Sequence, residues 1–218
     1  MVYTIYPNVK PTVDRAKRMI SVQDFPASLL APLNHHEKYL KSRGIESSKI
    51  SEYSAYYCED GICYILYGAF GYQVRVTNDT QQSARRGAGL RFLFPSGVSL
   101  RSALYAPART RFSGKELIVV EGTTDALAVA QLGYRTVSLL GSSVTPEKVA
   151  AIKGLLTEME DSILYMIPDN DLPGQKAAEK LCEGGLYPRL LYLPSYAKDI
   201  CDLDIVYRHE FLQERIIG

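Results

Sequence analysis

The chain has 218 residues, of which 46% are hydrophobic and 22% are charged, with 16 glycines and 11 prolines. This composition is typical of a folded globular protein and excludes a disordered or fibrous chain. The length predicts one large domain or two small ones and excludes a large multidomain enzyme within these residues.

The distribution of apolar and cysteine residues predicts a cytoplasmic protein with no membrane partner. No apolar run approaches the roughly 18 residues that a membrane span needs. The first thirty residues hold four basic side chains but lack the apolar block of a secretory signal. The four cysteines are too few and too scattered for a disulfide framework, which fits this location. They are Cys58, Cys63, Cys182 and Cys201.

The net charge of +1 conceals a strong asymmetry along the chain. Residues 1–115 hold 16 Lys and Arg against 8 Asp and Glu, a balance of +8, whereas residues 116–218 hold 9 against 16, a balance of −7. This division predicts two parts with different ligands. Basic residues are densest over 61–115, which hold eight Lys and Arg and a single acidic residue, an Asp. This density of positive charge suits a nucleic-acid backbone. A solvated basic face without a ligand is the alternative.

The basic part carries helix and strand patterns in turn. A short amphipathic helix is predicted over 35–44, and a second short helix over 47–53. The segments ICYILY (62–67) and YQVRV (72–76), rich in β-branched and aromatic residues, predict a pair of antiparallel strands. The polar stretch over 77–89 is expected to be a basic loop.

From Lys115 onward, apolar strand patterns alternate with amphipathic helix patterns. Strands are expected at LIVV, TVSLL, SILYMI and RLLYL, and helices over 125–132, from Thr145, over 174–183 and from about Asp199. This alternation predicts a parallel sheet with helices on both faces. The fold class is therefore α/β: a four-stranded, mostly parallel sheet over 115–205, preceded by a smaller basic α+β subdomain over 1–114 with antiparallel strands, and followed by a tail over 206–218.

Acidic residues follow three of the predicted parallel strands. Ligands of open α/β sheets gather at the carboxyl ends of the strands. So many carboxylates repel one another unless a cation lies between them, and hard oxygen ligands favour Mg²⁺ or Mn²⁺ over zinc. Each residue alone could cap a helix or serve a turn, but the three motifs together predict a divalent metal site. The residues are Glu121 and Asp125, then Asp169 and Asp171, then Asp199 and Asp202.

The order of these motifs resembles that of the Toprim domain, a metal-binding module shared by bacterial-type primases, topoisomerases and some nucleases. The resemblance runs from Leu117 to about Leu203, with Glu-Gly-x-x-Asp at 121–125, Asp-x-Asp-x-x-Gly at 169–174 and Lys-Asp-x-x-Asp at 198–202. Upstream, the segment 39–45 is similar to the first helix of the catalytic core of bacterial and phage-type DNA primases. Arg75 and the pair Arg91-Phe92 resemble the basic hairpin of that core.

The resemblance to primases implies a nucleotidyltransferase, a DNA-directed RNA polymerase that makes short RNA primers from ribonucleoside triphosphates on single-stranded DNA. It also implies two or more Mg²⁺ or Mn²⁺ ions and a location in the cytoplasm of a bacterium or a virus-infected cell. The expected catalytic residues are Glu121, Asp169 and Asp171, with Glu121 either a general base or a metal ligand. The expected metal ligands are Glu121, Asp125, Asp169, Asp171, Asp199 and Asp202, and the expected nucleotide and nucleic-acid contacts are Arg75, Arg85, Arg86, Arg91 and Lys198.

The sequence also departs from the primase pattern. Cys58 and Cys63 have no second ligand pair at zinc-site spacing, and no phosphate loop of a helicase is found. A separate zinc-ribbon protein or helicase is therefore an expected partner. Two alternatives stay open: a Toprim nuclease that hydrolyses phosphodiesters, and a non-catalytic nucleic-acid-binding factor of replication or recombination.

Overall fold

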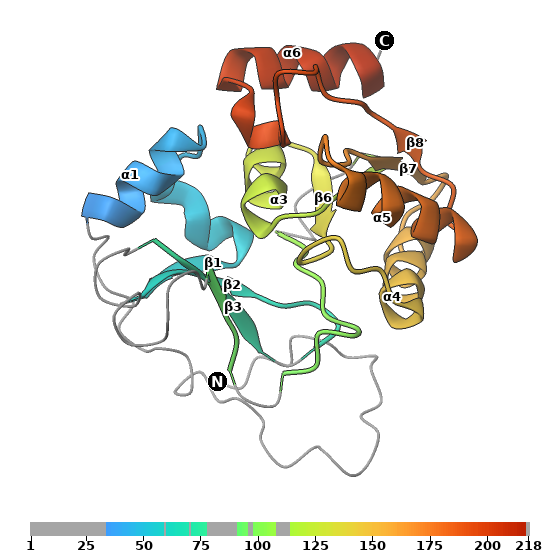
Figure 1. Cartoon of the computed structure of the whole chain (residues 1–218), viewed down its shortest axis with the longest axis horizontal. Helices are drawn as coiled ribbons and strands as arrows, with labels where there is room; N and C mark the ends of the chain where they lie inside the picture. The colour runs from blue at the N-terminus through green and yellow to red at the C-terminus, as the bar shows by residue number, and fades with distance from the viewer. Residues whose placement is uncertain are drawn as a thin grey trace.

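The computed structural model describes residues 34–58, 60–69, 71–77, 91–95, 98–107 and 114–216. Two four-stranded sheets and the helices that cover them make up this part of the chain (Figure 1). The helices are α1 (Asn34–Ser42), the 3-10 helix η2 (Ser47–Tyr53), α3 (Thr123–Ala130), α4 (Pro146–Thr157), α5 (Leu172–Glu183), the 3-10 helix η3 (Ile200–Asp202) and α6 (Ile205–Ile216). The strands are β1 (Ala55–Cys58), β2 (Gly61–Ile65), β3 (Tyr72–Val76), β4 (Phe92–Leu93), β5 (Glu116–Val120), β6 (Arg135–Ser138), β7 (Ile163–Met166) and β8 (Arg189–Leu190).

The first sheet has the order β1-β2-β3-β4, and every neighbouring pair is antiparallel. The expected pair β2 and β3 is confirmed, with Cys63 opposite Val74. Strand β1 was not predicted from the sequence. This strand begins directly after Ser54, whose left-handed backbone (φ 58°) ends η2 and reverses the chain.

The second sheet has the order β6-β5-β7-β8, and all its pairs are parallel. The predicted α/β fold with a parallel sheet is confirmed. Alternate residues of β5 point to opposite faces: Ile118 and Val120 pack toward α3 and α6, whereas Leu117 and Val119 pack toward α4 and α5. Helices therefore cover both faces, as expected from the wholly apolar strand (Figure 1).

The structure corrects two expectations about the C-terminal part: a predicted strand is shorter, and a predicted helix is divided. The strand expected at RLLYL is limited to β8, because the pairing with β7 ends at Met166 opposite Leu190, with a last hydrogen bond from the N–H of Leu191 to the Met166 carbonyl at 2.9 Å. The helix expected from about Asp199 is divided into η3 and α6. Leu203 between them is extended, and the carboxylate of Asp204 then accepts hydrogen bonds from the N–H groups of Val206 and Tyr207, each at 3.0 Å, which starts α6.

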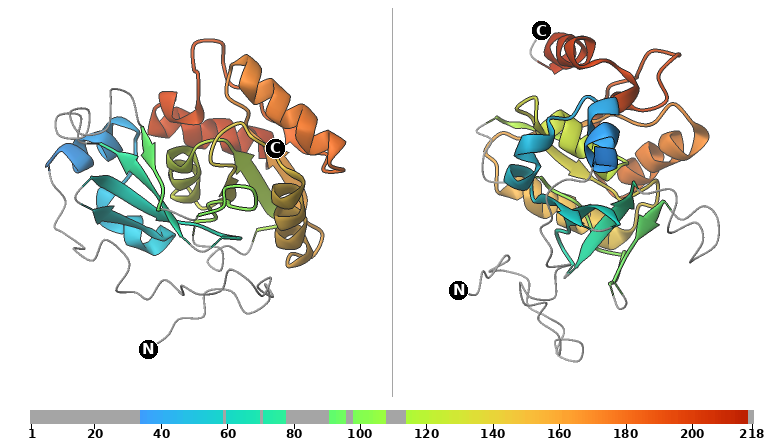
Figure 2. Two further views of the ribbon diagram at one scale, coloured as in Figure 1. Left: turned by 60° about the horizontal axis from the view of Figure 1, so that its bottom comes forward. Right: turned by 90° about the vertical axis from the view of Figure 1, so that its left-hand side faces the viewer.

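Tyr105 joins the two sheets. Its backbone forms an antiparallel bridge with Ser138 at the end of β6, and its hydroxyl donates to the carbonyl of Tyr53 at 2.7 Å. Its ring packs edge-on against Tyr64 of β2, with centroids 5.0 Å apart. The left view of Figure 2 shows the result: the antiparallel sheet and α1 lie on one side of α3, and α4 and α5 lie on the other. One buried cluster runs through both sheets.

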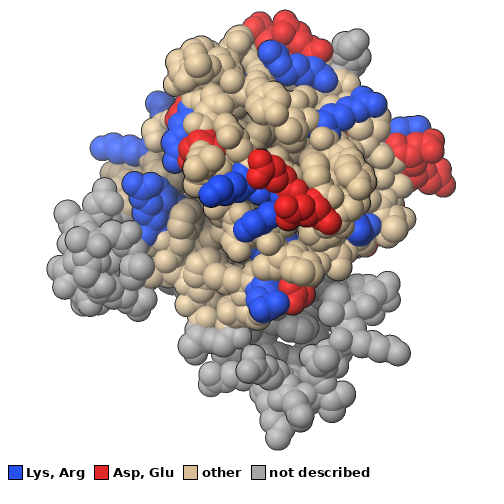
Figure 3. Space-filling view, turned by 45° about the vertical axis from the view of Figure 1, so that its right-hand side comes forward, with Lys and Arg blue, Asp and Glu red and all other residues tan. Residues whose placement is uncertain are grey.

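The outer side of α4 and α5 carries basic and acidic side chains interspersed, as the described part of the surface in Figure 3 shows. Such mixed charge does not single out this face as a phosphate-binding surface. None of the helices in the described part of the chain is long and apolar enough to cross a membrane.

Candidate functional site

Glu121 and Asp169 lie at the point where the strand order of the parallel sheet changes direction. Glu121 directly follows β5, and Asp169 follows the neighbouring strand β7. The chain passes from β5 to β6 on one side and returns to β7 on the other, which places a ligand-binding position at the carboxyl ends of β5 and β7. The backbone N–H of Asp169 donates to Oε1 of Glu121 at 3.1 Å, so the two motifs are in direct contact.

The close approach of these motifs requires a residue without a side chain at Gly174, in the first turn of α5. A Cβ atom there would lie 2.4 Å from the Asp169 carbonyl oxygen and 2.7 Å from Oε1 of Glu121. We expect Gly174→Ala to lower the free energy of unfolding by about 2 kcal/mol, because backbone atoms must move to admit the methyl group. Urea unfolding measures this change.

Gly154 in α4 provides the matched control. A Cβ atom at this position meets nothing within 4 Å, so Gly154→Ala should raise stability by up to about 1 kcal/mol through helix propensity alone. A Gly174→Ala variant as stable as Gly154→Ala would contradict the packing argument.

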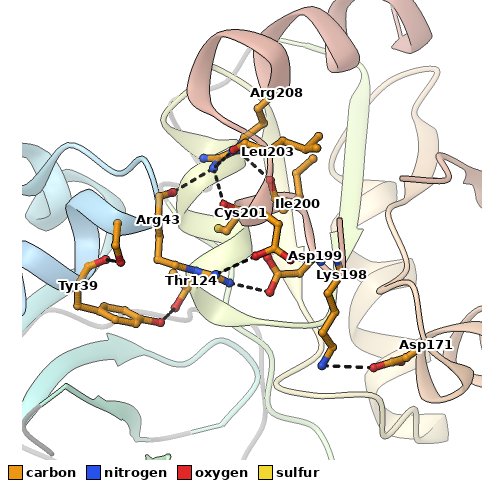
Figure 4. Close-up of polar contacts among 12 residues, drawn as sticks. Tyr39, Arg43, Thr124, Asp171, Lys198, Asp199, Ile200, Cys201, Leu203 and Arg208 are labelled. Carbon is orange, nitrogen blue, oxygen red and sulfur yellow. Dashed lines mark hydrogen bonds and ion pairs between the residues drawn. The ribbon is translucent and has the colours of Figure 1, made fainter. Parts of the chain in front are cut away.

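Asp171 caps α5 and faces Lys198. Its Oδ1 accepts a hydrogen bond from the N–H of Gly174 at 2.9 Å, and its Oδ2 lies 3.5 Å from Nζ of Lys198 (Figure 4). Asn170, between the two acidic residues of this motif, was given no role from the sequence. In the structure it connects the second motif to the third. Its N–H donates to the Lys198 carbonyl at 2.7 Å, and its Nδ2 donates to the carbonyls of Pro194 and Ala197 at 2.9 and 2.8 Å.

Asp125 meets the third motif from the other side. It belongs to the first turn of α3, a helix buried along its whole length. One oxygen each of Asp125 and Asp199 and the sulfur of Cys201 lie within 4.8 Å of one another. Cys201 was not predicted as part of the site, although its position two residues after Asp199, inside an acidic motif, was the available signal.

Arg43, which follows α1, holds the third motif in place. Its Nη2 lies 2.6 Å from Oδ2 of Asp199, and its Nη1 lies 3.3 Å from Oδ1 of Asp202 (Figure 4). The second oxygen of Asp202 accepts the backbone N–H of Lys198 at 2.8 Å. The structure thus gives both oxygens of Asp202 protein partners, whereas Asp199 keeps one oxygen without a partner in the described residues.

Burial and, after it, neighbouring carboxylates raise the pKa of three acidic residues at this edge. Burial, followed by the charges of Glu121 and Asp125, raises the pKa of Asp169 to about 8. Burial and then the Asp199 carboxylate raise the pKa of Asp125 to about 6. Burial also raises the pKa of Glu121, against the opposing effect of the Asp169 N–H. Charges that destabilise one another in this way are stabilised by a bound cation.

The residues fit a divalent cation. Oδ1 of Asp125 and Oδ1 of Asp199 are buried and have no hydrogen-bond partner among the residues that the structure describes. Buried polar atoms are nearly always partnered in proteins, so these oxygens point to a ligand of positive charge. Carboxylate oxygens are the donors that Mg²⁺ and Mn²⁺ prefer.

Arg75 of β3 is linked to this edge through Tyr39. Its guanidinium lies between two rings, 5.2 Å from the centroid of Tyr39 and 5.0 Å from that of Phe92. The Tyr39 hydroxyl is 3.1 Å from Oγ1 of Thr124, the neighbour of Asp125 (Figure 4). Arg91 is exposed beside β4. Arg85 and Arg86, which the sequence analysis assigned to nucleic-acid binding, lie outside the described residues.

Comparisons with known proteins agree with this architecture. Residues 118–203 match the family model described as Toprim-like. No curated protein sequence matches the chain. Among solved structures, the DnaG catalytic core is 17% identical, with a TM-score of 0.55 over 88% of this chain and 73% of that one. The primase fragment of the bacteriophage T7 primase-helicase is 21% identical, with a TM-score of 0.57 over 81% and 72%.

A third structure, the DnaG primase catalytic domain bound to single-stranded DNA, is 18% identical, with a TM-score of 0.54 over 87% of this chain and 70% of that one. The resemblance to the Toprim domain and to the fold of primase catalytic cores is thereby confirmed. At these identities the likeness concerns the fold.

Proposed function

We propose that the chain is the catalytic core of a DNA primase, which makes short RNA primers from ribonucleoside triphosphates on single-stranded DNA with Mg²⁺ or Mn²⁺. One observation carries the proposal: three acidic motifs meet at the carboxyl edge of the parallel sheet, and Arg75 reaches the same edge through Tyr39. An edge of this kind can bind both metal ions and the phosphates that they activate.

Two solved structures of the same fold support the assignment of ligands. One is a DnaG catalytic domain bound to single-stranded DNA, and the other contains T7 primase domains bound to an RNA/DNA hybrid, with a TM-score of 0.55. We infer that in this chain residues 1–114 hold the template and residues 115–205 hold the catalytic edge, with 206–218 following it. A separate helicase or zinc-ribbon protein is the proposed partner, in the cytoplasm of a bacterium or a virus-infected cell.

The residues suit the transfer of a nucleotide. In this reaction a ribose 3′-hydroxyl attacks an α-phosphate and pyrophosphate leaves. The metal ions, held by Asp125, Asp169, Asp171 and Asp199 with Glu121 and Asp202 beside them, would lower the pKa of the hydroxyl and neutralise charge on the phosphates. Oε1 of Glu121 is fixed by the Asp169 N–H, which leaves Oε2 to accept the hydroxyl proton or to bind an ion.

The cationic side chains would bind the phosphates. A guanidinium pairs with two phosphate oxygens at once. The Arg75 guanidinium packs on the rings of Tyr39 and Phe92, which position it before a ligand binds. Lys198 is exposed and reaches Asp171, so its ammonium group can move onto a triphosphate at little cost. Arg91, Arg85 and Arg86 are proposed to contact the template.

The decisive experiment supplies an RNA/DNA hybrid with a recessed RNA 3′ end, so that extension needs no template-recognition partner. Wild type is incubated with ribonucleoside triphosphates and Mg²⁺ or Mn²⁺, beside Glu121→Gln and Asp169→Asn. We expect labelled extension by wild type and at least a ~100-fold loss in both variants, because each change removes a group that acts on the reacting atoms. De novo synthesis on single-stranded DNA is then measured in the same way.

Asp161→Asn is the matched control. Its side chain is 83% exposed and lies just before β7, at the opposite edge of the sheet, so the variant should extend the primer as wild type does. A template degraded by wild type and protected in Glu121→Gln and Asp169→Asn would identify a nuclease instead. Metal-independent DNA binding without extension or cleavage would identify a non-catalytic binding factor.

A further inference from the structure

The group formed by Asp125, Asp199 and Cys201 combines two carboxylates with a thiol. One donor atom from each residue lies within 4.8 Å of the other two. Asp125 is contributed by α3, while Asp199 and Cys201 come from the short segment around η3, and the two helices are in contact. The donors are thus held by two separate elements of the fold.

Two of the three residues have a buried carboxylate oxygen without a hydrogen-bond partner among the described residues, while the Cys201 thiol donates a hydrogen bond to the Asp125 carboxylate. Asp125 is only 7% exposed, and its Oδ1 has no hydrogen-bond partner among the described residues. Oδ2 of Asp199 accepts a hydrogen bond from Nη2 of Arg43 at 2.6 Å, and its buried Oδ1 has no hydrogen-bond partner within the described part of the chain. An unpartnered buried carboxylate oxygen is costly, and a cation between the two oxygens removes that cost.

The guanidinium groups of Arg43 and Arg208 lie near enough to lower the pKa of Asp125, but their hydrogen bonds go to other groups. The guanidinium of Arg208 directs its hydrogen bonds to the backbone carbonyls of Ile200, Cys201, Leu203 and Arg43 (Figure 4). Arg43 engages the other oxygen of Asp199. The Oδ1 atoms of Asp125 and Asp199 therefore stay without a hydrogen-bond donor among the described residues.

We propose that Cys201 is a metal ligand, and that Asp125, Asp199 and Cys201 form a mixed oxygen and sulfur subsite. Such a subsite selects borderline divalent cations, of the class of Co²⁺ and Zn²⁺, over Mg²⁺, because thiolate sulfur is a soft donor. Binding forms a bond between sulfur and the metal and releases the thiol proton to solvent. The inference rests on the proposed function in that it adds a donor to the same acidic edge, but its test needs neither template nor nucleotide.

The test uses Co²⁺, since thiolate coordination produces a charge-transfer absorption that oxygen donors do not. The reduced, metal-free full chain is titrated with Co²⁺ in the presence of excess Mg²⁺, beside Cys201→Ser and Cys182→Ser. We expect a saturable band in wild type, no band in Cys201→Ser, and a Co²⁺ affinity at least about tenfold lower in that variant. Cys182 is exposed at the end of α5 and outside the group, so Cys182→Ser should match wild type.

The outcomes separate this inference from the proposed function. A wild type without the band, or a Cys201→Ser variant that keeps it, would overturn the thiolate ligand even if primers are made. A band without primer extension would overturn the primase and leave the subsite standing. Circular dichroism checks that Cys201→Ser is folded; if it is not, Asp125→Asn, which keeps the thiol, must bind Co²⁺ at least about tenfold more weakly than wild type.

Discussion

The metal-free protein is expected to lose stability as the pH rises from about 4 to about 8, and to regain it when Mg²⁺ is added. The pKa of Asp169 is raised from 3.8 to about 8, and that of Asp125 from 3.8 to about 6, in both cases mainly by burial. Between these values the folded state binds protons that the unfolded state has released. Stability therefore falls with rising pH in this window and is fully reduced above the folded-state pKa.

The size of the effect follows from the exposure of Asp169. Because this carboxylate is partly open to solvent, the full pKa shift overstates its contribution, and we expect a loss on the order of 2 kcal/mol. Urea unfolding in the presence of a chelator, at about pH 5 and about pH 8, measures the loss. Repeating the pH 8 measurement with Mg²⁺ measures its reversal by ligand binding.

Asp169→Asn isolates the contribution of this residue. The variant should be more stable than wild type at pH 8 without metal, nearly equal to it at pH 5, and far less stabilised by Mg²⁺, while Asp161→Asn should follow wild type throughout. The comparison is needed because burial lowers the pKa of His36 from 6.5. That group destabilises the fold below about pH 6.5 in both proteins, which opposes the carboxylate effect. Equal stability of wild type and Asp169→Asn at pH 8 would refute the destabilisation by the buried Asp169 charge.

The parallel sheet was predictable because its signals are local. Buried parallel strands are short apolar runs, and the helices between them begin at residues with capping side chains, Thr145 for α4 and Asp171 for α5. The antiparallel strand β1 was not predictable in the same way, because a left-handed residue at Ser54 decides where it begins. The division of the last segment into η3 and α6 depends on one capping carboxylate, Asp204.

The acidic part of the site was predictable because carboxyl ends of neighbouring parallel strands meet at one edge, so motif order alone places these carboxylates together. The residues that hold the motifs were missed for the opposite reason. Arg43 contacts Asp199 across 156 positions of the chain, and Arg208 contacts the carbonyl of Arg43 across 165. Contacts between residues so far apart in the chain cannot be predicted from periodicity or spacing within a short stretch of sequence.

Replacement of Arg208 by Met is expected to lower the free energy of unfolding by about 3 kcal/mol. Arg208 is 1% exposed, and its guanidinium donates to the carbonyls of Ile200, Cys201, Leu203 and Arg43 at 3.1, 3.3, 2.9 and 3.0 Å. Met fills most of the volume of the aliphatic stem but removes the guanidinium hydrogen bond from all four carbonyls; the carbonyl of Ile200 still accepts the N–H of Leu203 at 3.3 Å. Chemical unfolding of wild type and variant measures the difference.

Arg215→Met on the same helix is the control. Arg215 is exposed, pairs with Glu214 at 3.8 Å and lies over the ring of Phe211, so its loss should cost no more than about 1 kcal/mol. If the two variants were equally stable, the carbonyl network would have no energetic role.

A second measurement distinguishes support of the site from support of the fold. The carbonyls that Arg208 binds belong to the segment that carries Asp199 and Cys201, and to the residue Arg43 that pairs with Asp199. Arg208→Lys keeps the charge but has fewer donors, so it should retain more stability than Arg208→Met while binding Co²⁺ or Mg²⁺ more weakly than wild type. Unchanged metal affinity in Arg208→Lys would show that Arg208 stabilises the fold but does not position the metal ligands. Weakened affinity would make α6, which lies beyond residues 118–203, part of what positions the metal-binding edge.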